Sequence, residues 1–272
     1  MNPGESPGAG KRGGKKPAGA AETNLRAVIV GLPNTGKSQL FNDITGGYTL
    51  VSNYPLTTVE IHSKHASIRG RRYEIIDTPG MHGLYIQSEE EIAVRELLFD
   101  EHVDVLIQCI DANRLKSSLL FTLDLLELGI PMIVVLNAVD ETEKQGIEIN
   151  IHKLARTLGV QVVEHIASIN KGTEDVKAAL SRAEAAGWNP DYGPELERRL
   201  SELEALLPHD LSFRRKKALL LLEADPLLSA ELEKTLGAEA AGKFAHRLHH
   251  IRRESLGRPG RELAKRRTEN GS

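Results

Sequence analysis

The sequence predicts an α/β domain with a mixed, mainly parallel sheet, followed by a small all-helical domain. Two observations predict this arrangement. Short apolar, β-type runs alternate with helical patterns along the first two thirds of the chain, whereas the last third is rich in Leu, Ala, Glu, Arg and Lys. Alternating strands and helices are typical of a parallel sheet covered by helices. With 272 residues, the chain has room for both units, each with its own core.

The elements of the first domain follow from these runs. Strands are expected over residues 25–30, 72–77, 103–110, 131–136 and 160–166. Helices are expected over residues 38–45, 89–99, 116–128, 150–158 and 173–186. Within residues 58–77, two strands meet at Arg69-Gly70-Arg71, and a connection this short requires an antiparallel pair.

The second domain begins where the composition changes, around Gly187. Its clearest helix spans residues 195–207 and carries a stripe on one face, formed by Leu196, Leu200, Leu203 and Leu207. Such a stripe is typical of a helix packed on a core. We expect the chain to divide into a disordered Gly/Pro/Lys-rich tail, a nucleotide-binding domain, a helical domain and a flexible tail, at residues 1–23, 24–187, 188–262 and 263–272.

Charge and cysteine content exclude several classes of protein. A net charge of −3 and a pI near 6.4 give no overall basic field, so no nucleic-acid partner is expected. The basic run at residues 11–16 could contact phosphates or lipid head groups, but a solvated tail is favoured. The single Cys109 cannot form an internal disulfide, which fits a reducing compartment. No apolar stretch reaches the roughly 18 residues that span a bilayer, so we expect a soluble polypeptide.

A glycine-rich motif, GLPNTGKS, joins the first expected strand to the first expected helix. Its G-x-x-x-x-G-K-S spacing exposes backbone N–H groups and a helix N-terminus, which together cradle phosphate oxygens. Lys37 can reach the β- and γ-phosphates, and the Ser38 hydroxyl can ligate Mg²⁺. A glycine turn without a ligand is the minor alternative. We expect nucleotide contacts from Gly31, Asn34, Thr35, Gly36, Lys37, Ser38 and Gln39.

The DTPG motif ends another expected strand and predicts a nucleotide switch. There, Asp77 can hold Mg²⁺ through water, and the N–H of Gly80 can sense a γ-phosphate. The stretch NYPLTTVE, residues 53–60, lies earlier in the chain, and either of its threonines could supply a second protein ligand to Mg²⁺.

The NAVD motif predicts which nucleotide base is bound. Asp140 can accept hydrogen bonds from the guanine N1–H and exocyclic amine, while Asn137 braces the loop and the base edge. Adenine offers no such pair of donors, although NAVD alone would be an ordinary strand-end turn. After the last expected strand, a backbone N–H near Ser168 or Ile169 could reach the guanine O6. Together with the phosphate motif, these segments predict a site for GTP or GDP with Mg²⁺.

The ordered motifs GLPNTGKS, NYPLTTVE, DTPG and NAVD resemble a GTPase domain of the TRAFAC class, which implies a Ras-like P-loop fold. LVSNYPLTTVE and the long stretch from DANRLKSS to GVQVVE are similar to the cytosolic N-terminal part of FeoB, the bacterial ferrous iron transporter. The similarity covers residues 25 to about 180, and covers the helical remainder by position and character only. Departures from the family pattern are Leu56 in place of glycine, Met81-His82 after DTPG, and Ala138 in place of a bulkier residue.

The resemblance implies a specific function. In that family the GTPase domain precedes a helical domain, described as stabilising the GDP-bound form, and then a membrane domain. It implies GTP hydrolysis at the cytoplasmic face of the bacterial inner membrane, with the membrane permease domain of the same longer chain as partner; a homo-oligomer is left open. The resemblance puts the Mg²⁺ threonine at Thr58. The residues expected to act on the phosphates during hydrolysis are Asn34, Lys37, Thr58 and Gly80.

Hydrolysis cannot use the glutamine that Ras-like enzymes place after the switch glycine, because Met81 stands there. No arginine stands at an obvious position beside the phosphates. The resemblance implies a K⁺ ion held by Asn34 and by backbone carbonyls near Ser52 and Tyr54, and slow, K⁺-stimulated hydrolysis. The alternatives are that Asn34 only braces the loop, or that His82 helps to position water.

Other interpretations stay open. His246, His249 and His250 recur at a spacing that could hold a transition metal, but no carboxylate or cysteine joins them, so a solvated or packing role is favoured. A GTPase of ribosome or tRNA maturation would share the nucleotide motifs, but such proteins generally carry a basic RNA-binding module. A nucleotide-bound scaffold with negligible turnover is a third class.

Overall fold

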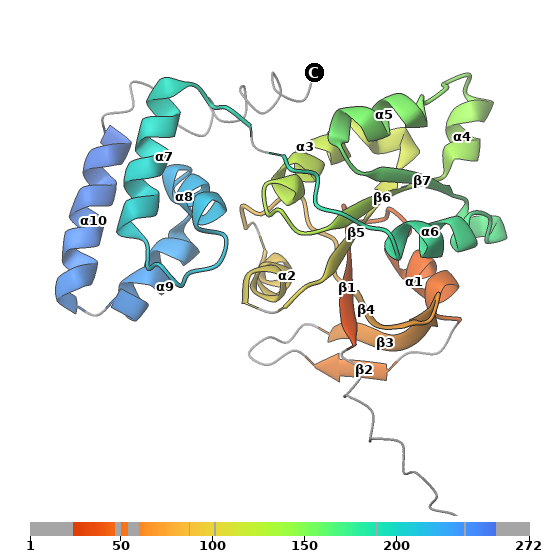
Figure 1. Ribbon diagram of the computed structural model, residues 1–272, viewed down its shortest axis with the longest axis horizontal. Helices are drawn as coiled ribbons and strands as arrows, with labels where there is room; N and C mark the ends of the chain where they lie inside the picture. The colour runs from red at the N-terminus through yellow and green to blue at the C-terminus, as the bar shows by residue number, and fades with distance from the viewer. Residues whose placement is uncertain are drawn as a thin grey trace, which may run out of the picture.

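The computed structural model describes residues 24–46, 50–53, 60–86, 88–100, 102–188, 190–236 and 238–253. Within these residues, seven strands form one sheet in the order β2-β3-β4-β1-β5-β6-β7 (Figure 1). The strands are β1 Leu25–Val30, β2 Leu50–Asn53, β3 Glu60–Ile68, β4 Arg71–Asp77, β5 Val105–Asp111, β6 Met132–Asn137 and β7 Gln161–His165.

The sheet is mixed and mainly parallel. β1 pairs in parallel with β4 and β5, and β6 extends this order between β5 and β7. β3 pairs antiparallel with β2 and β4, and its register joins Ile68 to Arg71 across a tight turn. The predicted antiparallel connection at residues 69–71 is therefore confirmed. The apolar runs do not predict β2, because its four residues are too few to show a period.

Helices cover both faces of the sheet. Alternate residues of β1 point to opposite faces, so that Ala27 and Ile29 join one apolar cluster, and Val28 and Val30 join the other. The first cluster is closed by α1 and α6, and the second by α2, α3 and α5. The helices and the short 3₁₀ turns of this part are α1 Lys37–Thr45, α2 Glu89–Asp100, η1 Ala112–Arg114, α3 Leu115–Leu126, α4 Val139–Lys144, α5 Ile151–Leu158, η2 Ala167–Ile169 and α6 Thr173–Leu180. This layering confirms the predicted α/β class.

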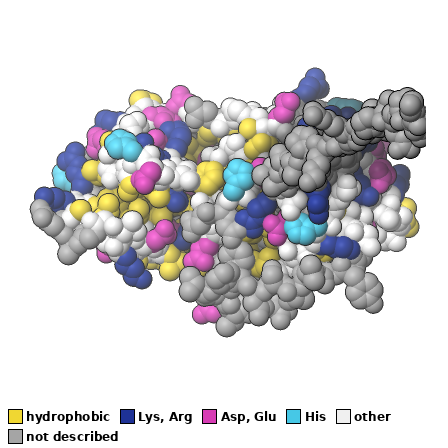
Figure 2. Space-filling model, turned by 60° about the horizontal axis from the view of Figure 1, so that its bottom comes forward, with side chains coloured by type: hydrophobic (Ala, Val, Ile, Leu, Met, Phe, Trp, Pro, Cys, Tyr) yellow, Lys and Arg dark blue, Asp and Glu magenta, His cyan; other side chains and the backbone are white. Residues whose placement is uncertain are grey.

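Four helices follow and lie to one side of the sheet (Figure 1). They are α7 Pro194–Leu206, α8 Arg214–Leu222, α9 Pro226–Leu236 and α10 Ala238–Arg253. The predicted leucine stripe on α7 is confirmed, because Leu196, Leu200, Leu203 and Leu207 are all buried. These leucines belong to the same apolar cluster as α2 and α3, so the division at residues 187 and 188 stays a prediction. Acidic and basic side chains are interspersed over this part of the surface (Figure 2).

The structure also differs from the sequence-based expectations. The helix expected over residues 173–186 is wrong beyond Leu180, where Arg182 and Ala183 form tight-turn hydrogen bonds and Glu184 then pairs with Met132 beside β6. Residues 1–23, residues 263–272 and the loop residues Tyr54 and Thr58 lie outside the described residues. None of the described helices combines the length and the apolar character needed to cross a membrane.

Candidate functional site

The sequence motifs meet at one edge of the sheet. β1, β4, β6 and β7 run parallel, and the phosphate loop (residues 31–36), the switch segment (residues 77–80), the base loop (residues 137–140) and the η2 turn lie at their carboxyl ends. In open α/β sheets, ligands bind outside the carboxyl ends of the strands. The fold therefore assembles a single candidate site from segments that are far apart in the sequence.

Close backbone approach fixes the glycines of the phosphate loop. Gly31 has φ 154°, and a Cβ there would lie 2.3 Å from the carbonyl oxygen of Cys109. Gly36 has φ 91°, and a Cβ there would lie 2.2 Å from Nδ2 of Asn137. Asn34 also has a left-handed backbone, with φ 63°. The loop therefore folds tightly against β5 and the base loop, a shape that larger residues at both glycine positions would prevent.

Two side chains close the phosphate loop from inside. The Thr35 hydroxyl donates to the carbonyl oxygen of Leu32 at 3.0 Å, and the Cys109 thiol donates to the carbonyl oxygen of Thr35 at 3.1 Å. Burial raises the pKa of Cys109 to about 12, which keeps this group a thiol and therefore a donor at neutral pH. Cys109 thus packs against the loop, as its place in a buried strand suggests.

Lys37 lies folded back across the phosphate loop. Its side chain is buried, and Nζ donates to the carbonyl oxygen of Leu32 at 3.0 Å. Burial lowers the pKa of the Lys37 ammonium, whereas the negative charge of Asp77 acts in the opposite direction. A buried ammonium with a neutral acceptor gains most when an anion such as a phosphate comes within reach.

Asp77 and Ser38 form an acceptor pair suited to a metal ion. Burial raises the pKa of the Asp77 carboxyl, although the neighbouring Ser38 hydroxyl and the charge of Lys37 act in the opposite direction. Within the described part of the chain, Oδ1 of Asp77 is buried with no hydrogen-bond partner. An unsatisfied buried carboxylate oxygen beside a hydroxyl fits Mg²⁺, which prefers oxygen ligands and water.

The switch segment packs directly on the phosphate loop. A Cβ on Gly80 would lie 2.7 Å from Cα of Pro33, and the Met81 N–H donates to the carbonyl oxygen of Gly31 at 3.1 Å. The Met81 side chain is fully buried in the core. The exposed ring of His82 lies 3.3 Å from a carboxylate oxygen of Glu91, which also accepts from the His82 N–H. Met81 therefore serves packing, and His82 is tied to α2.

Asn137 links three parts of the site. Its Nδ2 donates to the carbonyl oxygen of Thr35 at 3.1 Å, and its Oδ1 accepts from the Ala167 N–H at 3.1 Å. The side chain is nearly buried, so these bonds form away from water. One amide thus holds the phosphate loop, the base loop and η2 in fixed relative positions, which is the bracing role that the NAVD motif predicts.

Asp140 lies in the first turn of the short helix α4, at the edge of the site. Ala138, the N-cap residue of this helix, has a left-handed conformation with φ 59°, which turns the chain out of β6. The Asp140 carboxylate is part-exposed and pairs with Lys144, one helical turn later, at 2.9 Å. This hydrogen bond and the Asp140 charge raise the pKa of Lys144. The carboxylate is accessible to two donors of a purine base.

The η2 turn supplies the last predicted contacts. Ser168 and Ile169 lie in η2, and the Ile169 side chain is 68% exposed. Asn170 follows with φ 50°, and Gly172 packs so closely that a Cβ there would lie 2.2 Å from the carbonyl oxygen of Glu164. The turn therefore presents backbone groups beside the Asn137 brace.

The remaining predicted residues are only partly placed. Gln39 donates to Oδ1 of Asp43 at 2.8 Å on the outer side of α1. Asn34 is exposed at the turn of the phosphate loop. Ser52 lies in β2 opposite Ile61 of β3. For the proposed K⁺ and Mg²⁺ ligands Tyr54 and Thr58, the structure gives no placement.

Sequence reasoning missed one arginine at this site. Arg114 donates from Nη1 to the carbonyl oxygen of Pro33 at 3.2 Å, across 81 positions of sequence. Arg114 thus contacts the phosphate loop, a position that its place in the sequence does not suggest. The reason is topological. β5 pairs with β1, so Arg114, the last residue of the η1 turn after β5, lies beside the loop that follows β1. Only a prediction that β5 pairs with β1 could have indicated this contact from the sequence.

Three histidines of α10 lie at one surface hollow. His246, His249 and His250 line an open hollow of about 390 Å³ together with Arg253. Among the residues that the structure describes, no group of three His, Cys, Asp or Glu side chains could hold a metal ion. A cationic neighbour also disfavours a bound cation, so the packing or solvated role is favoured.

Known proteins share both sequence and fold with this chain. The family described as Ferrous iron transport protein B matches residues 25–180. The Fe(2+) transporter FeoB of Escherichia coli (strain K12) is 35% identical over 211 residues, which are 74% of this chain and 27% of that protein. The chain thus spans about a quarter of the length of this curated relative.

Solved structures extend the similarity into the helical part. A mutant of S. thermophilus NFeoB bound to GDP superposes with a TM-score of 0.78 at 30% identity, covering 91% of this chain and 97% of the other. A mutant of the same protein bound to GDP.AlF4- gives a TM-score of 0.74 at 29% identity, covering 91% and 98%. The Ras-like P-loop GTPase fold is thereby shown, and the chain belongs to the Ferrous iron transport protein B family as its N-terminal GTPase domain.

Proposed function

We propose that this chain binds and hydrolyses GTP with Mg²⁺, as the regulatory domain of a longer ferrous iron transporter. The observation that carries this proposal is the Asn137 brace, which joins the phosphate loop to the base loop and to η2. These bonds would hold Lys37 and Asp140 at a fixed spacing on one edge of the sheet. A nucleotide whose phosphates and base are both recognised requires such a fixed spacing.

The phosphate half of the site has a residue for each task. Lys37 would bind the β- and γ-phosphates, and the backbone N–H groups of residues 34–38 would cradle the phosphate oxygens. Ser38 and Asp77 would hold Mg²⁺, with Thr58 as a further ligand; Mg²⁺ neutralises charge that develops between the β- and γ-phosphates. Gly80 would donate its N–H to the γ-phosphate. Because Gly80 packs on Pro33, its position depends on the position of the phosphate loop.

The base half selects guanine. Asp140 would accept from the N1–H and the exocyclic amine, and a backbone N–H of Ser168 or Ile169 would donate to O6. Adenine has a hydrogen-bond acceptor at N1 and no amine at C2, so it would leave the carboxylate opposed by a lone pair. The GDP bound to the S. thermophilus relatives supports this choice.

Hydrolysis in this chain would proceed without a glutamine. Met81 is fully buried and His82 contacts Glu91, so each of these side chains already has a structural contact. We assign the missing positive charge to a K⁺ ion held by Asn34 and by backbone carbonyls near Ser52 and Tyr54. Such an ion supplies charge stabilisation where an arginine finger would act. The exposed, left-handed Asn34 at the loop's turn fits this role.

The transport role rests on the relatives. The curated FeoB proteins are longer, and a membrane permease domain in the same polypeptide would place this domain at the cytoplasmic face of the inner membrane. The nucleotide state would then be communicated through the helical part. The alternative, a GTPase of ribosome or tRNA maturation, is not favoured by the family match.

A comparison of monovalent cations tests the hydrolysis proposal. Single-turnover release of phosphate from GTP should be at least about tenfold faster in K⁺ than in Na⁺, since an arginine finger is worth ~10³ to 10⁵ in rate. Asn34→Ala should remove most of this difference and leave the affinity for GDP nearly unchanged. Equal rates in the two cations would contradict the K⁺ assignment, and the absence of hydrolysis in both would make the chain a nucleotide-bound scaffold.

A further inference from the structure

Arg114 lies at the phosphate loop and has no role in the site as described so far. It is the last residue of η1, and its side chain is exposed while Nη1 donates to the carbonyl oxygen of Pro33 at 3.2 Å. The carbonyl oxygen of Leu32, just before Pro33, accepts a hydrogen bond from Nζ of Lys37. Asn34 follows directly. The guanidinium therefore holds the middle of the loop that carries the phosphate-binding residues.

Pro33 is restrained from a second side. Gly80 packs so closely on it that a Cβ would lie 2.7 Å from both N and Cα of Pro33. The Met81 N–H donates to the carbonyl oxygen of Gly31 in the same loop. Pro33 thus lies between the switch segment and η1, and a shift of its peptide group would change the distance between the phosphate loop and Gly80.

The η1 turn is itself anchored to the base side. The Asp111 carboxylate accepts from the Asn113 backbone N–H at 2.9 Å and from its Nδ2 at 3.0 Å. Nδ2 of Asn113 also donates to Glu141 at 3.0 Å, and Gln145 donates to Oδ1 of Asn113 at 3.1 Å. Both partners belong to α4 or directly follow it, so Arg114 extends from a turn that is fixed to the helix of Asp140.

We infer that Arg114 is a positioning residue for GTP hydrolysis, which holds the Pro33 carbonyl and thereby sets the phosphate loop against Gly80. This inference rests on the proposed function. It predicts an effect on turnover more than on binding, because the phosphates of GDP are retained by Lys37 and by the backbone of α1, whereas the γ-phosphate must also meet Gly80. Small displacements of groups around a reacting phosphate slow the reaction strongly, up to about 10²-fold for 1 Å.

The test compares three variants of the full chain. Arg114→Ala should lower kcat for GTP about tenfold or more and leave KM and the affinity for GDP within about threefold. Arg114→Lys keeps a long donor and should recover most of kcat. Lys116→Ala removes the same charge from an exposed position two residues away and should leave kcat unchanged.

Salt separates positioning from a direct charge effect. The loss in Arg114→Ala should be equal at about 0.05 and 0.5 M ionic strength at fixed K⁺, because a hydrogen bond to a neutral carbonyl is hardly screened, whereas an exposed charge acting on the nucleotide is. Unchanged kcat in Arg114→Ala, a change in KM alone, or a loss that vanishes at high salt would each overturn the inference. A native chain that does not bind guanine nucleotides would instead overturn the proposed function.

Discussion

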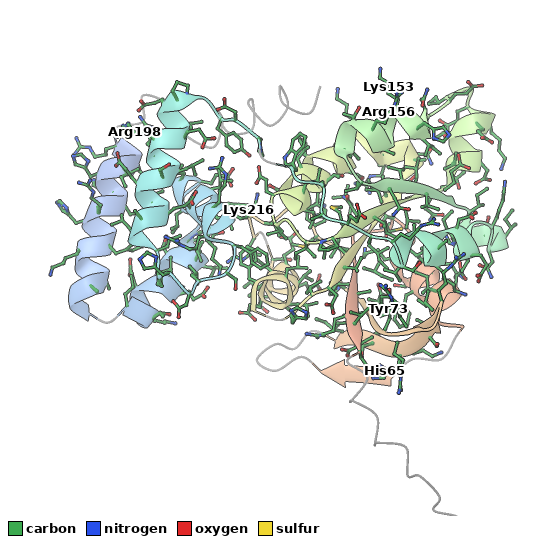
Figure 3. All side chains as sticks on the ribbon, viewed as in Figure 1. His65, Tyr73, Lys153, Arg156, Arg198 and Lys216 are labelled. Carbon is green, nitrogen blue, oxygen red and sulfur yellow. The ribbon has the colours of Figure 1, made fainter. Side chains whose placement is uncertain are left out.

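Two buried lysines of this molecule have opposite surroundings. Lys37 is 7% exposed, and its acceptor is a neutral backbone carbonyl; among the described residues no carboxylate forms an ion pair with it. Lys216 on α8, labelled in Figure 3, is 1% exposed and pairs with Asp124 of α3 at 2.7 Å and with Glu127, which caps the end of α3. A buried ammonium is costly unless it is paired. Lys37 is therefore suited to an anionic ligand, and Lys216 to structure.

The comparison extends to the regions around the two lysines. Near Lys37, Oδ1 of Asp77 is buried without a hydrogen-bond partner in the described structure. By contrast, the contact between α2, α3 and the helical part contains direct ion pairs, since Arg95 of α2 bonds Asp225 at 2.6 Å and also reaches the carbonyl oxygen of Leu84. Lys37 and Asp77 thus leave charge available to a ligand, whereas the charges of Lys216 and Arg95 are paired across the contact between the sheet and the helical part.

The largest expected effect comes from breaking the structural lysine. Lys216→Met keeps the length of the side chain but leaves Asp124 and Glu127 without their shared cation, which should lower the free energy of unfolding by about 3–5 kcal/mol. Chemical denaturation measures this difference. Lys234→Met, at an exposed position on α9, is the matched control and should be nearly neutral. An unchanged free energy of unfolding in Lys216→Met would show that the contact between the sheet and the helical part does not depend on this ion pair.

The ligand-site lysine should behave in the opposite way. Lys37→Met removes a buried charge whose pKa burial already lowers, so the melting temperature of the nucleotide-free chain should stay equal or rise. GTP hydrolysis should fall by at least about 10²-fold, as when a donor to developing negative charge is removed. Thermal denaturation and phosphate release check both parts. Destabilisation with retained hydrolysis would reverse the roles of the two lysines.

Base recognition can be inverted at one position. Asp140→Asn replaces an acceptor by a donor opposite the purine 2-position, so GDP affinity should fall about 10²-fold and XDP should become the preferred ligand. Calorimetric titration with GDP and XDP measures the exchange. Glu143→Gln, on the same helix and exposed, should leave both affinities unchanged. A retained preference of Asp140→Asn for GDP would show that the base loop does not bind the purine.

The smallest expected effect is a pH-dependent gain in stability. The pKa of Asp77 is raised by burial, so its charged form destabilises the nucleotide-free fold above that pKa. Asp77→Asn should therefore raise the melting temperature at pH 7, and the gain should shrink as the pH falls toward the ordinary value of 3.8 and native Asp77 becomes protonated. The same variant should bind GTP less tightly with Mg²⁺. A gain that grows in acid would contradict the raised pKa.

The sequence predicts the ligand site better than the contact between the sheet and the helical part, for a physical reason. The phosphate loop is encoded locally, because two glycines, Lys37 and Ser38 stand at fixed spacing between a strand and a helix. The contacts of Lys216 and Arg114 span 92 and 81 positions and depend on how distant elements pack. No periodicity reports such a pairing. The same limit hides β2, whose four residues gain their conformation from β3.

The central claim is that Lys37, Asp77 and Asp140 at the carboxyl edge of the sheet form a guanine-nucleotide site. Single-turnover phosphate release by the native chain, with GTP and with ATP in Mg²⁺ and K⁺, tests it most directly. The account predicts release from GTP, at least about 10²-fold less from ATP at equal concentration, and loss of the GTP reaction in Lys37→Met. Equal release from ATP and GTP, or undiminished GTP hydrolysis by Lys37→Met, would contradict it.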